Sequence, residues 1–413
     1  MPSHFRRPLR HALPTRLGAD FAWLWSASAV SNVGDGALLA AGPLLVLSLT
    51  DEPAAVAAAV FVQQLPWLLF AVLSGVWVDR LDRRRLVIAV DTCRGAVLAS
   101  LTAVVATHST SLWQVYVALF LLGIGETLAD NATGALIATS VKPSHLGRAN
   151  ARLYLTFTVG NQLVGPPIGA LLFAGGAALP LGLDAVSFLV AAVLVARTTA
   201  VPRPEGDSTR PRRGLLEEAA EGLACLRRHP ALRALTVCIF VMNVTFTGAF
   251  AAYVLYARDR LGLTSAQFGL LITAGAVGGI AGTAVYGRLE SRVSVVTLLR
   301  VGLLVETATH LVLAVTRSPL VAGATMAVFG VHAVVWGVVA TTTRQRATPP
   351  ALLGRVASVY LLASTGGSAL GALLGGLVAQ GLGLTAPFWL AFAAMALVTA
   401  VAWRPLATVR PRP

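Results

Sequence analysis

Charged residues are scarce in this sequence of 413 amino acids, since Asp, Glu, Lys and Arg together make up 12% of it. Soluble domains carry about twice that fraction. Hydrophobic residues make up 56%, and the mean hydropathy is +0.74, which is more apolar side chain than a water-soluble fold could bury. The composition therefore excludes a soluble globular protein and indicates a chain that lies in a membrane.

Cysteine, histidine and lysine are also rare, and each shortage excludes a class of function. Three cysteines cannot form a disulfide framework, and the seven histidines show no metal-ligand spacing. The single lysine, Lys142, has no glycine-rich loop before it, so the chain cannot build the phosphate-binding loop of an ATP-driven pump. No nucleophile is matched with a base. We therefore expect no enzyme, no metal ion and no cofactor.

Long apolar runs replace the missing charge. They recur along the chain, and each is roughly 20 residues or longer, enough to cross about 30 Å of hydrocarbon as a helix. The pattern predicts an all-α membrane protein with twelve transmembrane helices. The expected spans are 21–49, 54–78, 86–106, 112–140, 150–174, 178–197, 231–257, 266–288, 294–315, 319–343, 354–380 and 384–403.

The net charge of +14 is distributed between the apolar runs rather than gathered on one face. This distribution argues against a nucleic-acid partner, which requires clustered basic residues. The N-terminal segment, the even-numbered connections and the C-terminal tail hold nearly all the arginine. Because basic residues mark cytoplasmic loops, we expect a multi-pass protein of the cytoplasmic (inner) membrane with both termini in the cytoplasm.

The chain divides near its middle. Pro202, Pro204 and Pro211 interrupt the apolar pattern, and an amphipathic stretch follows that suits a helix on the membrane surface or a plain spacer. Leu-Gly-Arg-Ala at 146–149 returns half a chain later as Leu-Gly-Arg-Val at 353–356. Such parallel repeats are the plan of transporters that bind substrate between two halves. The expected parts are an N-terminal six-helix half at 1–197, a cytoplasmic linker at 198–230 and a C-terminal six-helix half at 231–413.

The connection after the second span reads Gly-Val-Trp-Val-Asp-Arg-Leu-Asp-Arg-Arg-Arg at 75–85. Glycine permits close helix contact, an aspartate can cap a facing helix start, and arginines stay at the cytoplasmic surface. The loop resembles the signature of the major facilitator superfamily, Gly-x-x-x-Asp-Arg-x-Gly-Arg-Arg/Lys, except that Asp82 replaces the second glycine. The resemblance implies the major facilitator fold and a cytoplasmic latch between the halves. The latch residues are Gly75, Asp79, Arg80 and Arg84.

The fifth span holds Gly-Asn-Gln-Leu-Val-Gly-Pro-Pro-Ile-Gly-Ala at 160–170. A proline at mid-span removes a backbone hydrogen bond, and glycines let a neighbouring helix come close, so we expect a bend packed against a partner helix. The segment resembles the antiporter signature of drug exporters in the superfamily, Gly-x-x-x-Gly-Pro-x-x-Gly-Gly. The match is partial, because Asn161 and Ala170 depart from it, and an ordinary structural kink is the alternative. The matching residues are Gly165, Pro166 and Gly169.

Shorter motifs narrow the resemblance. They are Ser-Asn-Val-Gly-Asp at 31–35, Glu-Thr-Leu-Ala-Asp at 126–130, Gly-Arg-Ala-Asn at 147–150, Leu-Asp-Ala-Val-Ser-Phe at 183–188 and Arg-Gln-Arg at 344–346. Together they are similar to the transmembrane-secretion-effector-like branch of bacterial exporters, which includes macrolide-efflux and siderophore-export proteins. The resemblance implies export and leaves the cargo open.

In the superfamily plan the first, fourth, seventh and tenth spans line a central cavity, and polar residues concentrate on these spans here. Carboxylates within hydrocarbon are costly and mark a substrate or proton pathway by default. Mutual repulsion predicts that Glu126 or Asp130 holds a proton near neutral pH. Asp35 could instead bond a neighbouring helix, and Asp130 could pair with Arg148. The proton-coupling candidates are Asp35, Glu126 and Asp130. The substrate-cavity candidates are Asn32, Asn243, Thr247, His332 and Trp336.

Other charges within the spans are interpreted as structural. Asp91 and Arg94 are three apart on the third span and are expected to pair with each other, as are Glu306 and His310 on the ninth. The arginine that the superfamily usually has on the fourth span is absent, since residues 119–121 are Leu, Phe and Leu. Its proton relay is therefore not copied residue by residue.

The sequence thus predicts a secondary active transporter that exports small, largely apolar or cationic organic molecules, such as drugs or natural products, by proton antiport. We expect alternating access by rocking of the two halves in a monomer. The expected partners are protons, a small-molecule substrate and the lipid bilayer. The alternatives are an importer of the same fold and a non-transporting membrane receptor or scaffold.

Overall fold

The computed structural model of the chain describes residues 17–142, 145–199, 215–349 and 352–408. Within these ranges the side chains of residues 71–80, 138, 215–219 and 408 are outside the description. Every regular element of the described residues is helical. This is what hydrocarbon requires, because a helix satisfies its backbone N–H and C=O groups within one segment.

The first half, as the term is used from here on, comprises the helices that precede residue 199. They are α1 (Ala19–Leu49), α2 (Pro53–Arg80), α3 (Arg83–Ala106), α4 (Leu112–Ser140), α5 (Leu146–Thr156), the π-helix η2 (Phe157–Val164), α6 (Gly165–Gly175) and α7 (Ala178–Ala196). A linker helix, α8 (Leu215–Arg228), follows.

The second half contains the remaining helices. They are α9 (Pro230–Phe250), α10 (Tyr253–Leu255), the π-helix η3 (Tyr256–Arg260), α11 (Ser265–Arg292), α12 (Val295–Val315), α13 (Pro319–Ala347), α14 (Leu353–Leu382), α15 (Ala386–Ala402) and the 3₁₀-helix η5 (Pro405–Thr408).

The twelve expected spans are found in the described part of the chain. Ten helices are long and apolar enough to cross a membrane: α1 to α4, α7, α9 and α11 to α14. The fifth span is divided into α5, η2 and α6, and the last is the shorter apolar helix α15, which brings the number of passages to twelve. The fold class predicted from the apolar runs is therefore confirmed.

Short polar motifs start several of these helices. Asp82, the residue that departs from the superfamily signature, caps α3, because its Oδ1 accepts a hydrogen bond from the Arg85 N–H at 2.9 Å. Thr264 and Gln267 form a capping box at the start of α11, and Ser111 and Gln114 form another at α4. Each motif satisfies backbone donors that the first helical turn leaves without partners.

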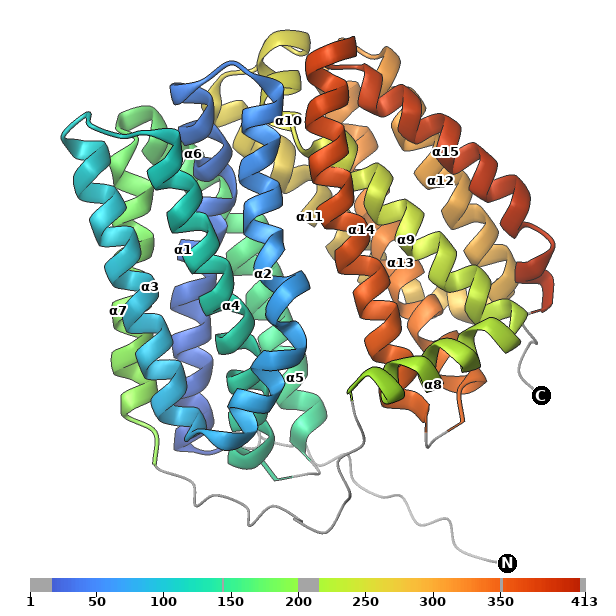
Figure 1. The fold of residues 1–413 in the computed structure, drawn as a ribbon, viewed down its shortest axis with the longest axis horizontal. Coiled ribbons are helices and arrows are strands. Elements are labelled where there is room, and N and C mark those ends of the chain that lie inside the picture. Colours follow the sequence, from blue (N-terminus) through green and yellow to red (C-terminus); the bar gives the residue numbers. More distant parts are fainter. Residues whose placement is uncertain (1–16, 143–144, 200–214, 350–351, 409–413) are drawn as a thin grey trace, which may run out of the picture.

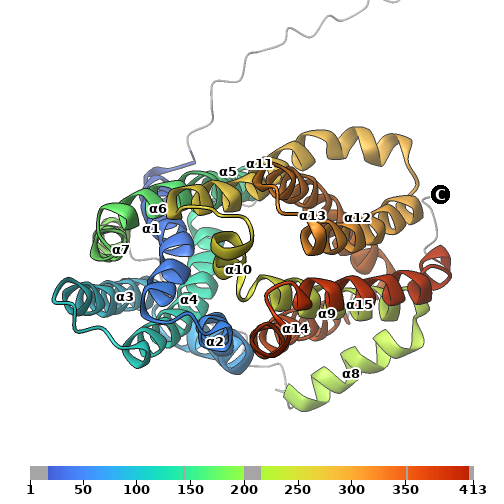
Figure 2. The same ribbon diagram turned by 90° about the horizontal axis from the view of Figure 1, so that it is seen from above.

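The two halves lie side by side (Figures 1 and 2). In both views α2 lies beside α14. This pair and the pair of α6 and α11 make contacts between the halves. The ribbons of the two halves meet near α10 and diverge toward α5 and α8 (Figure 1). The molecule is therefore closed at the end that carries the odd-numbered connections.

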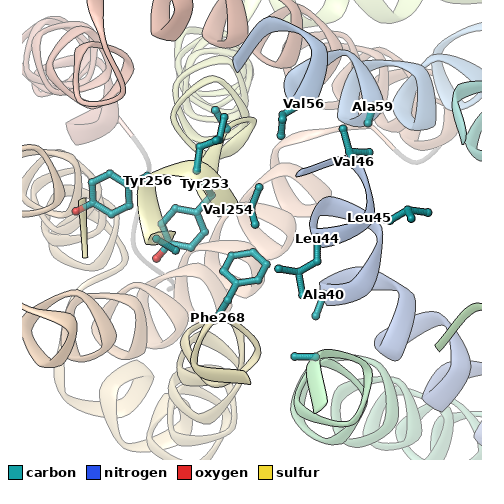
Figure 3. Close-up of a cluster of buried hydrophobic side chains, with 14 of the residues drawn as sticks. Ala40, Leu44, Leu45, Val46, Val56, Ala59, Tyr253, Val254, Tyr256 and Phe268 are labelled. Atoms are coloured by element: carbon teal, nitrogen blue, oxygen red, sulfur yellow. The ribbon is translucent and has the colours of Figure 1, made fainter. Parts of the chain in front are cut away.

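A hydrophobic cluster at that end draws on both halves. Figure 3 shows Val254 of α10 and Phe268 of α11 pointing toward Leu44 of α1, with Val56 of α2 close by. All four side chains are buried. Close packing of this kind holds helices together in a membrane, where burial from water contributes little.

An ion pair spans the two halves at the same end. Arg258 Nη1 in η3 lies 2.7 Å from Asp51 Oδ1, which follows α1. Hydrogen bonds to Asp259 and to Asp51 raise the pKa of Arg258, so the guanidinium stays protonated. The Asp51 side chain is 78% exposed, and exposed pairs contribute only about 0–1 kcal/mol. The apolar cluster therefore contributes more than this ion pair to holding the two halves together at this end.

The linker helix α8 packs against α14 and α9. Its Glu221 accepts a hydrogen bond from Arg355 at the start of α14. Gly222 lies against the same residue, because a Cβ there would be 2.6 Å from the Arg355 carbonyl oxygen. Leu226 is buried with Val356. The amphipathic face of α8 is thus used for docking onto the second half.

Candidate functional site

A cavity of about 1000 Å³ lies between the two halves. One side of its wall comes from α1 to α5, η2 and α7, and the other side comes from α9, α10, α11 and α13. This volume is at the upper end of what small-molecule sites usually have. The cavity can therefore hold an organic molecule of considerable size.

The two halves contribute different chemistry to the wall. Among the described residues, the charged and amide groups that line the cavity all come from the first half: Asp35, Gln63, Gln64, Arg94, Glu126, Asn161 and Gln162. The second half supplies mainly apolar groups, among them Phe246, Phe250, Phe268 and Phe329. The Phe246 ring stacks on Phe250 at 4.3 Å and on Phe329 at 4.8 Å between ring centroids. A polar wall thus faces an aromatic wall.

The polar wall is organised around Arg94 of α3. Its Nη2 lies 3.0 Å from Asp35 Oδ1 on α1, and its guanidinium carbon lies 3.8 Å from the centre of the Phe188 ring. Glu126 of α4 lines the same wall. The Arg94 side chain is only 10% exposed, so its charge acts in a medium that screens weakly. Four carboxylates lie within electrostatic reach of Arg94: Asp35, Glu126, Asp91 and Asp184.

The expected pairing of Arg94 with Asp91 on the same helix is wrong, because Arg94 pairs with Asp35 of α1 instead. Gly125 of α4 makes this possible. A Cβ at Gly125 would lie 2.7 Å from Arg94 Cγ, so the arginine stem runs where another residue's side chain would stand. Arg94 thereby brings to the cavity wall the positive charge that the fourth span lacks.

Asp184 of α7 lies behind the polar wall and is fully buried. Its Oδ1 accepts a hydrogen bond from Ser187 Oγ at 2.9 Å. The same oxygen presses on α1 at Gly34, where a Cβ would lie 2.2 Å from it. Two of the short sequence motifs, at 31–35 and 183–188, therefore meet here.

The fifth passage lies against α1 through its glycines. A Cβ at Gly165 would be 2.5 Å from Gly36 Cα, and a Cβ at Gly169 would be 2.0 Å from the Ala37 carbonyl oxygen. Pro166 is buried in the first turn of α6, the part of a helix in which proline is best tolerated. The motif expected to permit close helix contact thus lies at such a contact.

The irregular segment begins before the prolines, in the π-helix η2. A π-helix widens the backbone and commonly marks a functional site. Here it places Asn161 and Gln162 in the cavity wall. The expected bend is therefore a π-helical stretch followed by a new α-helix at Gly165.

The other face of α6 meets the second half at Gly269 of α11. A Cβ at Gly269 would lie 2.7 Å from both the Pro166 carbonyl oxygen and the Ala170 Cβ. Thr273, one turn further along α11, donates a hydrogen bond to the Leu163 carbonyl oxygen at 3.3 Å. The fifth passage is thus held between α1 of its own half and α11 of the other.

Of the proton-coupling candidates, Asp35 and Glu126 line the cavity, whereas Asp130 is exposed outside it. None of the five substrate-cavity candidates is among the lining residues. Asn32 donates to the Ser28 carbonyl, and Asn243 accepts from Ser368. The candidates outside the cavity are Asn32, Asn243, Thr247, His332 and Trp336.

His332 and Trp336 were expected to line the cavity, but the residues of α13 that line it lie on another face of the helix. Phe329, Ala333 and Gly337 line the cavity, whereas the two rings point toward α12, where they pack on Gly302. A helix with polar side chains on two faces does not reveal from sequence which face is inward. Sequence reasoning also interpreted Arg94 as structural and so missed its place in the cavity wall, although an arginine within an apolar span marks a functional site by default.

The latch candidates are described only in part. Gly75, Asp79 and Arg80 are described only by their backbone, which belongs to α2. Arg84 donates a hydrogen bond to the Ala196 carbonyl at the end of α7 in its own half. The latch between the halves stays a prediction.

Comparison with known proteins supports the same fold. The sequence model of the transmembrane secretion effector family matches residues 12–410. The enterobactin exporter EntS of Escherichia coli O1:K1 / APEC is 27% identical over 373 residues, which cover 87% of this chain and 85% of EntS.

Solved transporters share the fold at low identity. A bacterial homologue of the iron transporter ferroportin, in an inward-facing state, is 19% identical with a TM-score of 0.73, over 94% of this chain and 98% of the other. A bacterial homologue of the lysosomal transporter Spinster, inward-facing and unoccupied, is 15% identical with a TM-score of 0.72, over 95% and 98%.

The family match covers almost the whole chain, and the helical architecture agrees with it. The relatives are transporters rather than enzymes. This multi-pass membrane protein belongs to the transmembrane secretion effector family of the major facilitator superfamily.

Proposed function

We propose that the protein exports small organic molecules by proton antiport, with the cavity as the site where substrate and proton compete. The observation that carries the proposal is the polar wall, in which Asp35, Arg94 and Glu126 stand together in a cavity between the two halves. Two carboxylates and one arginine leave this wall one positive charge short. A proton or a cationic substrate can supply that charge, and competition for it couples the two.

The aromatic wall supports a cargo with an apolar or aromatic face. A molecule that places such a face on Phe246, Phe250 and Phe329 can present its polar groups to the first half. Natural products and drugs have this amphipathic character. Export of a siderophore by the EntS relatives supports the outward direction.

We further infer the location and orientation of the protein. Basic residues on the even-numbered connections support a cytoplasmic-membrane protein with both termini inside the cell. The closure of the odd-numbered end by Leu44, Val56, Val254 and Phe268 supports an inward-open state. The enclosure of the cavity by the two halves of one chain supports a monomer as the transporting unit. Rocking of the halves about this end is then the transport step.

Inverted bacterial membrane vesicles test the proposal, because their interior corresponds to the outside of the cell. With the interior acidified, the parent protein should accumulate a probe against its gradient. Ethidium serves as the aromatic cation and enterobactin as the siderophore. Asp35→Asn and Glu126→Gln should abolish uphill accumulation, since each removes a carboxylate for which proton and substrate compete, while downhill exchange is partly retained.

Asp130→Asn is the matched control, because Asp130 is exposed and outside the cavity. It should have the milder effect. If both neutral cavity variants concentrate the probes as well as the parent does, the proton pathway lies elsewhere. If the protein instead accumulates the probe in right-side-out vesicles whose exterior is acidified, the protein is an importer and the export proposal is wrong.

A further inference from the structure

A second group of titratable side chains lies inside the second half, between α12 and α13. Glu306 Oε2 of α12 is 2.9 Å from His332 Nε2 of α13, and Glu306 Oε1 is 3.5 Å from His310 Nε2 one turn along α12. All three side chains are at most 3% exposed. The group joins two neighbouring helices, whereas sequence reasoning placed Glu306 and His310 in a pair within one helix.

Several polar atoms of this cluster have no hydrogen-bond partner. They are Glu306 Oε1, His310 Nδ1, His310 Nε2 and the neighbouring Trp336 Nε1. Buried polar groups are normally satisfied, and one left without a partner costs about 1–3 kcal/mol. Glu306 Oε1 and the His310 imidazole, which face each other, can therefore each form a further hydrogen bond.

A proton is the ligand that fits this capacity. With Glu306 ionised and one imidazole protonated, the cluster is neutral. A second proton converts the 3.5 Å contact between His310 and Glu306 Oε1 into a charge-assisted hydrogen bond, so that each carboxylate oxygen faces one imidazolium. Histidine is the side chain whose charge changes between about pH 5 and pH 8. No group of three or more His, Cys, Asp or Glu in the described residues could hold a metal ion, which argues against a metal as the ligand.

No other charge in the described residues faces the cluster from a packed neighbour. The helices that pack against α12 and α13 are α9, α11, α15 and η5. α15 and η5 carry no charged residue, and the charged residues of α9 and α11 are in their end turns. They are Arg233, Arg288, Glu290 and Arg292. The proton count of the cluster is therefore set by Glu306, His310 and His332 themselves.

The cluster lies one layer behind the aromatic wall. The His332 ring meets the Phe329 ring edge-on with centroids 5.7 Å apart, and Phe329 lines the cavity. Gly302 of α12 makes room for this arrangement, because a Cβ there would lie 3.1 Å from His332 Cε1 and 2.8 Å from Trp336 Cε3. The site is thus separate from the carboxylates of the first half and close to the cavity.

We propose that Glu306, His310 and His332 form a proton-binding site of the second half, which holds one proton at neutral pH and gains a second on acidification. Glu306 is the carboxylate that both imidazoles share. The site binds protons whichever cargo the cavity takes, so the proposal stands apart from the antiport proposal.

Nuclear magnetic resonance of histidine-labelled protein in detergent micelles tests the site. Signals that His310→Gln and His332→Gln remove assign the two imidazoles. In the parent both should change ionisation state between about pH 5 and pH 8, in two coupled steps. Glu306→Gln keeps the shape but removes the charge, so His310 and His332 should then stay neutral down to about pH 5.

His229→Gln is the matched control, because His229 is exposed and far from the cluster in the chain, and it should leave both titrations unchanged. If Glu306→Gln does not fold, the proposal is judged on the other variants, since His310→Gln should by itself remove the second step from His332. Two histidines that never titrate in the folded parent, or a His332 titration unaffected by loss of His310, would overturn the proposal and leave a fixed structural contact.

Discussion

The hydroxyl of Thr273 on α11 lies 3.3 Å from the carbonyl oxygen of Leu163, and this hydrogen bond connects the second half to the first. Pro167 has no backbone N–H, so the Leu163 carbonyl lacks the donor that an α-helix places four residues further on. The same hydroxyl lies 3.0 Å from the Gly269 carbonyl of its own helix. The Thr273 hydroxyl has one proton, so it can donate a full hydrogen bond either to the Leu163 carbonyl across the interface or to the Gly269 carbonyl of its own helix, but not to both.

Thr273→Val should therefore destabilise the state in which the two halves meet here. One hydrogen bond contributes about 0.5–1.5 kcal/mol, which corresponds to a change of a few-fold in the ratio of conformations. Spin labels at positions 109 and 317, on two odd-numbered connections, report the change as a distance distribution. Thr273→Ser should behave like the parent.

Thr283→Val is the matched control for this prediction. Thr283 lies on the same helix and bonds only the Gly279 carbonyl, at 3.1 Å. Equal distance distributions in the parent and in Thr273→Val would show that the hydroxyl stays with Gly269.

Arg94→Gln should stop coupled transport, because it leaves Asp35 and Glu126 in the cavity wall without their counter-charge. Asp35→Asn in the same chain returns the wall to one carboxylate in excess, as in the parent, so the double variant should bind ethidium with an affinity closer to that of the parent than Arg94→Gln does. Binding titrations of the parent and both variants at one pH measure this. A double variant no closer to the parent than Arg94→Gln alone would mean that the arginine acts through other groups.

Gly165→Leu should cost far more activity than Gly175→Leu. A side chain at position 165 collides with the Gly36 backbone at 2.5 Å, whereas the nearest atom at position 175 is a flexible Leu179 side-chain carbon at 3.6 Å. Transport by each variant is normalised to the amount of folded protein in the membrane. Equal loss of expression in both variants would reduce the motif to ordinary folding glycines.

Asp79→Asn tests the proposed cytoplasmic latch. A carboxylate at the end of α2 can interact with the positive N-terminal end of α14 near Gly354, and its neutralisation should raise the inward-open population and lower transport. Labelling of single cysteines on both faces of the membrane measures the shift, with insertion unchanged. Unaltered labelling together with normal export would contradict the latch.

The helices were predictable because their physical cause is local. Hydrocarbon requires continuous apolar helices, so each of the twelve spans is visible as a run of residues without reference to its neighbours. The break in the fifth span was also visible, because proline and glycine act on their own backbone. The π-helix that places Asn161 and Gln162 in the cavity was not, since its register depends on contacts with α1 and α11.

Only the charged residues of the site could be predicted from the sequence, because burying a charge in hydrocarbon has a large free-energy cost. Asp35 and Glu126 could be selected because a carboxylate in an apolar span needs a reason, and both line the cavity. His332 and Trp336 were assigned to the cavity from their helix alone, and they face α12 instead. Neutral and aromatic side chains are tolerated on any face of a membrane helix, so their direction has no local signature.

The amino-acid sequence by itself determined the membrane, the number of passages and the residues that carry charge into it, because burial of charge and backbone is penalised wherever it occurs. Only the tertiary structure decided which charges meet. Arg94 pairs with Asp35 across two helices because Gly125 on a third clears the path of its side chain. Glu306 joins His332 because α12 has a glycine where α13 presents two rings. Both pairings are set by helix packing, and no spacing along one helix contains that information.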